Sequence, residues 1–96
     1  MSYKILKPIS LNEIIPFVKE FFTQNTVIDL SEIDVTLTEI ISFEEIAHQK
    51  RENGTSFVLI NSTIAIDEIP EEINIVPTLQ EALDVIEMDE MMRDLE

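Results

Sequence analysis

The chain has 96 residues, of which 45% are hydrophobic, and this size suits a single domain with one modest core. Its twenty acidic and six basic residues give a net charge of −14, which repels the phosphates of nucleic acids and the anionic surface of a membrane. Cysteine is absent and there is only one glycine, which excludes disulfides, thiol chemistry and glycine-rich phosphate loops.

The segment that begins at Met1 lacks the continuous apolar stretch of a secretory signal, and no hydrophobic run is long enough to span a bilayer. The absence of cysteine agrees with a reducing compartment. We therefore expect a soluble cytoplasmic protein without membrane contact, and the whole chain, residues 1–96, is expected to form one domain.

Four short apolar runs predict β-strands because they are rich in β-branched or aromatic residues. They are Tyr3–Leu6, Val27–Leu30, Phe57–Ile60 and Ile73–Val76. Segments with helical spacing lie between them, and such alternation favours parallel strands covered by helices. The sequence therefore predicts an α/β fold with a small, four-stranded, mostly parallel sheet and helices packed on it.

The first predicted helix begins at Ser10, which forms a capping box with Glu13. Its hydrophobic residues recur at intervals of three and four as far as Phe22. Pro16 removes an amide donor, so it either kinks this helix or marks its true start.

A second capping box, Thr36 with Glu39, predicts a helix that continues to a stop at Asn53 and Gly54. Gly54 is expected in the left-handed conformation. A short helical turn is predicted over residues 64–69, before Pro70.

The terminal helix is predicted over residues 78–95, with Thr78 and Glu81 as its capping box. Its first half has a core-facing stripe, whereas the hydrophobic residues of its second half cluster on roughly the opposite side. The first stripe comprises Leu79, Ala82, Leu83 and Ile86, and the second comprises Val85, Met88, Met91, Met92 and Leu95.

Either this helix bends around the domain, or its distal half projects and presents the methionines to another chain. Methionine repacks easily and is common on adaptable binding surfaces, so we expect a protein partner or self-association into a homo-oligomer. The alternative is that the end of the helix folds back on its own domain or frays.

Side chains for catalysis or metal binding are few. His48 is the only imidazole, and Glu44, four residues earlier, is near enough on a helix for a surface contact. The acidic pairs Asp67–Glu68 and Glu71–Glu72 lack the glycine of a calcium loop. We expect no metal, no cofactor and no enzymatic activity, although carboxylate chemistry in a cleft is left open.

The polar segment between the second strand and the second helix is the other candidate surface. It lies where ligands and partners dock on open α/β sheets, and Thr36 or Thr38 could be phosphorylated there. Capping of the helix by Thr36 explains the same residues without any modification. The predicted partner-binding residues of this segment are Asp34, Thr36, Leu37, Thr38 and Glu39.

Several strings together resemble the STAS family, the domain named for sulfate transporters and anti-sigma-factor antagonists. They are residues 27–31, the helix end at Asn53-Gly54, residues 56–59 and residues 75–83, and the acidic Ile86-Glu-Met-Asp-Glu tail is similar to that of small stand-alone bacterial members. The resemblance covers roughly residues 25–95. It implies a STAS-like fold and non-enzymatic regulation through protein binding.

Members of that family that act as phosphorylation switches carry Asp-Ser-Ser-Gly or a close variant between this strand and helix. The present chain has Asp34 to Thr38 without the glycine, and the equivalent of the phosphorylated serine falls at Leu37 or Thr38. Whether this chain has the phosphorylation switch of those members is therefore left open by the sequence. A second hypothesis is an acidic decoy that occupies the basic groove of a nuclease or another nucleic-acid enzyme.

Overall fold

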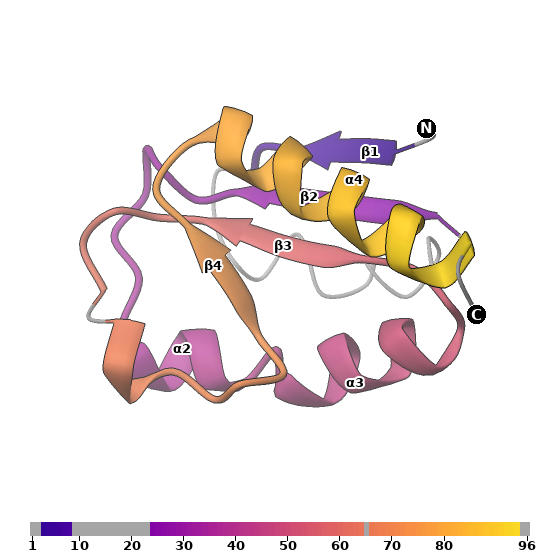
Figure 1. Cartoon of the computed structure of the whole chain (residues 1–96). Coiled ribbons are helices and arrows are strands. Elements are labelled where there is room, and N and C mark those ends of the chain that lie inside the picture. The colour runs from indigo at the N-terminus through magenta and orange to yellow at the C-terminus, as the bar shows by residue number, and fades with distance from the viewer. Residues whose placement is uncertain (1–2, 9–23, 65, 95–96) are drawn as a thin grey trace.

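The computed structural model describes residues 3–8, 24–64 and 66–94, and in this part of the chain four strands form one sheet (Figure 1). The strands are β1 (Tyr3–Leu6), β2 (Asn25–Asp29), β3 (Phe57–Ile60) and β4 (Asn74–Val76), in the order β1-β2-β3-β4. All neighbouring pairs are parallel. The predicted α/β fold is confirmed, and the helix predicted from Ser10 lies outside the described residues.

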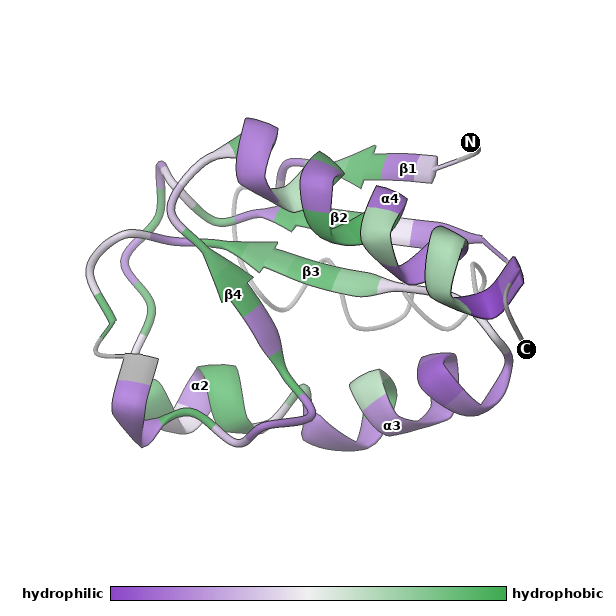
Figure 2. Cartoon of the chain, in the orientation of Figure 1, coloured by the Kyte–Doolittle hydropathy of each residue, from purple (hydrophilic) through white to green (hydrophobic). Residues whose placement is uncertain are grey.

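The two central strands have helices on both sides. All four residues of β3 are buried, and Val27 and Ile28 of β2 are fully buried. A parallel strand covered on both faces has a continuous apolar sequence, which explains the unbroken Phe57–Ile60 run. Figure 2 shows this hydrophobic layer along the strands and the hydrophilic residues on the outside of α3.

Two helices cover one face of the sheet, α2 (Leu37–Ile41) and α3 (Glu44–Glu52). They were predicted as one continuous helix. The break lies at Ser42 and Phe43, where the Ser42 hydroxyl donates to the Glu39 carbonyl and the Phe43 amide donates to Ile40 three residues back. These local bonds compete with the hydrogen bonds of a continuous helix. At the same break Phe43 is buried against Phe57, and the two ring centroids lie 5.8 Å apart.

The end of α3 agrees with prediction. Gly54 has a φ of +75°, the left-handed conformation that glycine adopts without steric cost. The amide of Gly54 donates to Arg51 and that of Thr55 donates to Lys50, which together form a Schellman motif. The chain is thereby turned directly into β3.

The connection from β3 to β4 contains one helical turn, η1 (Ile66–Glu68), within the predicted 64–69 segment. Strand β4 starts one residue later than predicted. It pairs with the second half of β3, from Val58↔Asn74 to Ile60↔Val76. The beginning of β3 therefore has β2 on one side and no described strand on the other.

Helix α4 (Leu79–Asp94) covers the opposite face, across β2 and β3 (Figure 1). Thr78 begins it as predicted, because the Thr78 hydroxyl accepts the Glu81 amide at 3.3 Å. Ala82 and Ile86 are fully buried against Val27 of β2 and against Val58 and Ile60 of β3. The helix runs antiparallel to the strands, which brings its distal half to the N-terminal ends of β2 and β3.

None of the described helices has both the length and the apolar character needed to cross a bilayer.

Candidate functional site

The distal half of α4 is held on the sheet by polar contacts. Asn25 donates to Glu90 at 2.7 Å, and the Ser56 hydroxyl donates to Asp89 at 2.7 Å. Arg93 donates to the same Ser56 oxygen at 2.9 Å. The Asn25 side-chain oxygen in turn accepts the Ser56 amide at 2.8 Å, so the five residues form one network.

This network explains the two stripes of the helix. With residues placed 100° apart, Asp89, Glu90 and Arg93 continue the side on which Ala82 and Ile86 are buried. The sequence reading treated the acidic residues as a break in the core-facing stripe. Asn25 and Ser56, buried at the starts of β2 and β3, provide their hydrogen-bond partners instead. The distal half therefore lies against the sheet.

The opposite side of α4 carries the methionine face, which we define as Met88, Met91 and Met92. These side chains are 66%, 61% and 64% exposed. Val85, which was predicted on the same stripe, is partly buried and packs on the core beneath α4. Leu95, the last predicted member, lies outside the described residues.

The segment after β2 is ordered by short-range hydrogen bonds. Asp29 accepts hydrogen bonds from both the amide and the hydroxyl of Ser31. Burial raises the pKa of Asp29, but the two Ser31 hydrogen bonds and the positive charge of Lys7 outweigh it, so the net effect is a lowered pKa. Lys7 also pairs with Glu32 at 3.3 Å, which links the end of β1 to this loop.

Thr36 is the N-cap of α2, as predicted. Its hydroxyl accepts the Glu39 amide at 3.2 Å, and its own amide donates to the Glu39 carboxylate at 2.9 Å. Asp34 and Thr38 are exposed, whereas Leu37 and Glu39 are half-buried. The polar segment is thus a solvent-accessible turn whose conformation is fixed by the capping box.

The two predicted partner-binding regions lie at opposite ends of the molecule. Asp34 to Glu39 follow the C-terminal end of β2, whereas the methionine face lies over the N-terminal ends of β2 and β3 (Figure 1). Sequence reasoning did not specify their separation. They are two surfaces and do not form one continuous site.

His48 joins α3 to the segment before β4. One ring nitrogen lies 3.1 Å from Glu72 and the other lies 3.1 Å from Glu52. The hydrogen bond and charge of Glu72, followed by the charge of Glu52, raise the pKa of His48 above its ordinary value. The contact with Glu44 considered from the sequence is replaced by these two.

Within the described residues, no group of three or more acidic and histidine side chains is arranged to hold a metal ion.

Lys50 is the one lysine that lies fully buried among the described residues. Its ammonium group donates to the Gln24 carbonyl at 2.7 Å. Burial lowers the pKa of Lys50 to about 8. Sequence analysis missed this residue because a helix-surface lysine gives no sign that its face is covered.

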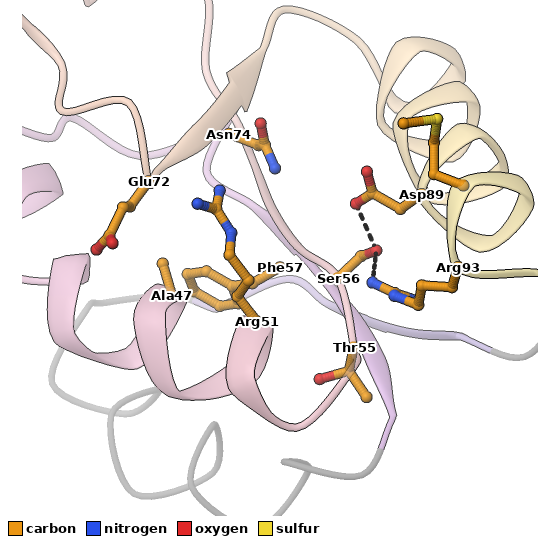
Figure 3. Close-up of a pocket in the computed structure, with 10 residues that line it drawn as sticks. Ala47, Arg51, Thr55, Ser56, Phe57, Glu72, Asn74, Asp89 and Arg93 are labelled. Carbon is orange, nitrogen blue, oxygen red and sulfur yellow. Dashed lines mark hydrogen bonds between the residues drawn. The ribbon is translucent and has the colours of Figure 1, made fainter. Parts of the chain in front are cut away.

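A recess of about 250 Å³ lies between α3, α4 and the N-terminal end of β3 (Figure 3). Arg51 enters it from α3 and Arg93 enters from α4, on the other side. Its remaining polar lining comprises Thr55, Ser56, Glu72, Asn74 and Asp89. The sequence carried no signal for this recess, because its residues come from four elements brought together only by the fold.

Comparison of the chain with protein-family models, with curated proteins and with solved structures finds no match.

Proposed function

We propose that this protein is a non-enzymatic regulatory module that docks onto another protein through the methionine face of α4. The observation that carries the proposal is the exposure of Met88, Met91 and Met92, each above 60%, on a helix whose other side is anchored to the sheet. Contiguous exposed apolar side chains of this kind mark interaction surfaces. Anchoring limits the conformational entropy that α4 loses on binding.

The charge around the face defines the kind of partner. Asp84, Glu87 and Asp94 are exposed on the same helix and flank the methionines. A second copy of the chain carries the same charge of −14 and is repelled. The surface therefore suits an apolar groove with a basic rim on a different protein, into which an amphipathic helix can be laid.

The polar segment from Asp34 to Glu39, in which Asp34, Thr36 and Thr38 are exposed, is the second surface of the proposed module. Its position after the C-terminal end of β2 is one where open α/β sheets commonly bind partners. The resemblance to the STAS family supports the same role, with Thr36 and Thr38 as the hydroxyls available for phosphorylation. Thr36 would lose its capping geometry on modification, whereas Thr38 would not, so Thr38 is the better acceptor.

Affinity capture from native lysate with two matched variants tests the proposal. The triple variant Met88→Gln, Met91→Gln, Met92→Gln keeps helix propensity and removes the apolar face. The control changes one exposed residue of the same helix that lies outside the methionine face and its acidic surroundings, Gln80→Ala. We expect one partner with the wild type and the control, and loss of that partner with the methionine variant. Equal recovery with all three proteins would refute the proposal.

The acidic decoy is the second candidate, and the surface along α3 favours it. Glu44, Glu45 and Glu52 are exposed there, and Glu71 is exposed in the segment before β4. Such a surface could occupy a basic nucleic-acid groove. Binding that weakens steeply with salt and survives the methionine substitutions would select this function over the first.

A further inference from the structure

The recess exists because β4 is short. Its pairing with β3 begins at Val58, so Phe57 and Ser56 have no neighbour on that edge among the described strands. In a parallel ladder successive residues turn their amides to opposite sides. Ser56 bonds to the β2 side, where its carbonyl accepts the Thr26 amide, so the Phe57 amide is directed to the open side. Phe57 itself is buried, with 3% of its surface exposed.

Positive charge is concentrated at this recess in a strongly acidic protein. Arg51 and Arg93 account for two of only six basic residues in the chain, and both line the recess. No carboxylate of the described residues lies within ion-pair distance of either guanidinium. Guanidinium groups bind planar carboxylates in a bidentate manner, and a backbone amide provides a further donor.

The recess also contains negative charge, which determines the ligand class. Asp89 faces it from α4 (Figure 3). Glu72 lines its edge, but the Glu72 carboxylate is directed toward the His48 ring, 3.1 Å away. A multiply charged phosphate would be repelled by the Asp89 carboxylate, whereas a ligand with its own ammonium group would be attracted to it. Ala47, Phe57 and Met92 complete the wall and give an apolar contact for a side chain.

We infer that the recess is a binding site for a free α-amino acid. The ligand carboxylate lies between Arg51 and Arg93 with the Phe57 amide as a donor, and the ligand ammonium group faces Asp89. The volume of about 250 Å³ accommodates a ligand of this size. The recess shares Met92 with the methionine face. Its test measures the binding of free amino acids to the wild-type protein, so the result does not depend on the proposed function.

Titration calorimetry on the full chain with each of the common free amino acids tests the inference. We expect at least one to bind, and we expect its carboxamide and its N-acetyl derivative to bind at least about tenfold more weakly. Arg51→Gln and Arg93→Gln should each weaken binding by about tenfold or more, whereas Lys7→Gln, which removes a distant positive charge, should not.

Absence of binding by every amino acid would overturn the inference. Inorganic phosphate that binds as tightly as the best amino acid would also overturn it, because the site would then be a general anion site. The comparison of ligand derivatives uses the wild-type protein, so the result does not depend on the folding of any variant.

Discussion

Thr36 controls the start of α2 through a single hydroxyl. That hydroxyl accepts the Glu39 amide, which would otherwise lack a partner in the first turn of the helix. Thr38 lies two residues later and is exposed. The two threonines therefore differ in structural importance, although both are candidates for modification.

Replacement of each threonine separates these roles. Thr36→Ala should lower the free energy of unfolding by about 1 kcal/mol, because the N-cap acceptor is lost. Thr38→Ala is the matched control and should change it by less than about 0.5 kcal/mol. Urea unfolding followed by circular dichroism measures both values. Equal losses in the two variants would contradict the assignment of Thr36 as the cap.

The buried Lys50 makes stability depend on pH in the alkaline range. Its pKa is about 8 in the folded protein and 10.5 as an ordinary lysine. Between these values the unfolded chain binds more protons than the folded protein, so the free energy of unfolding rises with pH. Below pH 8 the amine is protonated in both states and contributes no pH dependence.

Lys50→Met removes this titrating group. We expect the stability of the wild type relative to the variant to increase as the pH rises from about 8 to 10.5. Urea unfolding of both proteins across this range measures the difference. A difference that stays constant with pH would show that Lys50 titrates normally in the folded protein.

At the scale of elements, α4 has two kinds of attachment. Its first half is held by burial of Ala82 and Ile86, and its second half is held by hydrogen bonds to Asn25 and Ser56. Polar contacts of this type contribute about 1 kcal/mol each, so the distal half is the less stable part of the helix.

Ser56→Ala should loosen the distal half of α4 selectively. Loss of the hydroxyl removes the contacts of both Asp89 and Arg93. Hydrogen exchange should become faster at amides 89–93 and stay unchanged at amides 82–86. Ser62→Ala, in an exposed loop, is the control. Uniform acceleration along α4 would contradict the division into two attachments.

His48 connects α3 to the segment before β4, and as the only imidazole it is readily followed by NMR. Glu72→Gln should lower the pKa of His48, because Glu72 supplies the largest stabilisation of the charged ring. Glu44→Gln should leave that pKa unchanged. A lower pKa of His48 in Glu44→Gln, with an unchanged pKa in Glu72→Gln, would instead show that His48 contacts Glu44 as expected from the sequence.

The strands and helix caps could be predicted from sequence because their signals are local. Phe57–Ile60 is an unbroken apolar run. The Thr36 hydroxyl can cap the start of a helix, and Gly54 can adopt the left-handed conformation that ends one. The break at Ser42 was missed because it depends on the burial of Phe43. The recess and the partners of Asp89 and Glu90 were missed because they are formed by contacts more than 30 residues apart in the chain.

At the scale of the whole molecule, the proposed docking surfaces occupy opposite ends of one small domain. The polar segment at Thr36 follows the C-terminal end of β2, whereas the methionine face lies over the N-terminal ends of the strands. A module of this form can hold one partner through α4 while the other end stays accessible to a modifying enzyme.

The same charge distribution predicts the state of the isolated protein. Two copies with a net charge of −14 each should repel, so sedimentation at moderate salt should show a monomer at every concentration. A dimer that the triple methionine variant abolishes would instead identify the methionine face as a site of self-association.

The most direct test of protein docking through α4 is photo-crosslinking in the native cell, with a benzophenone amino acid at position 91 and, as the control, at position 80 of the same helix. Our proposal predicts a discrete protein adduct from position 91 and none from position 80. No adduct from position 91, or the same adducts from both positions, would contradict it.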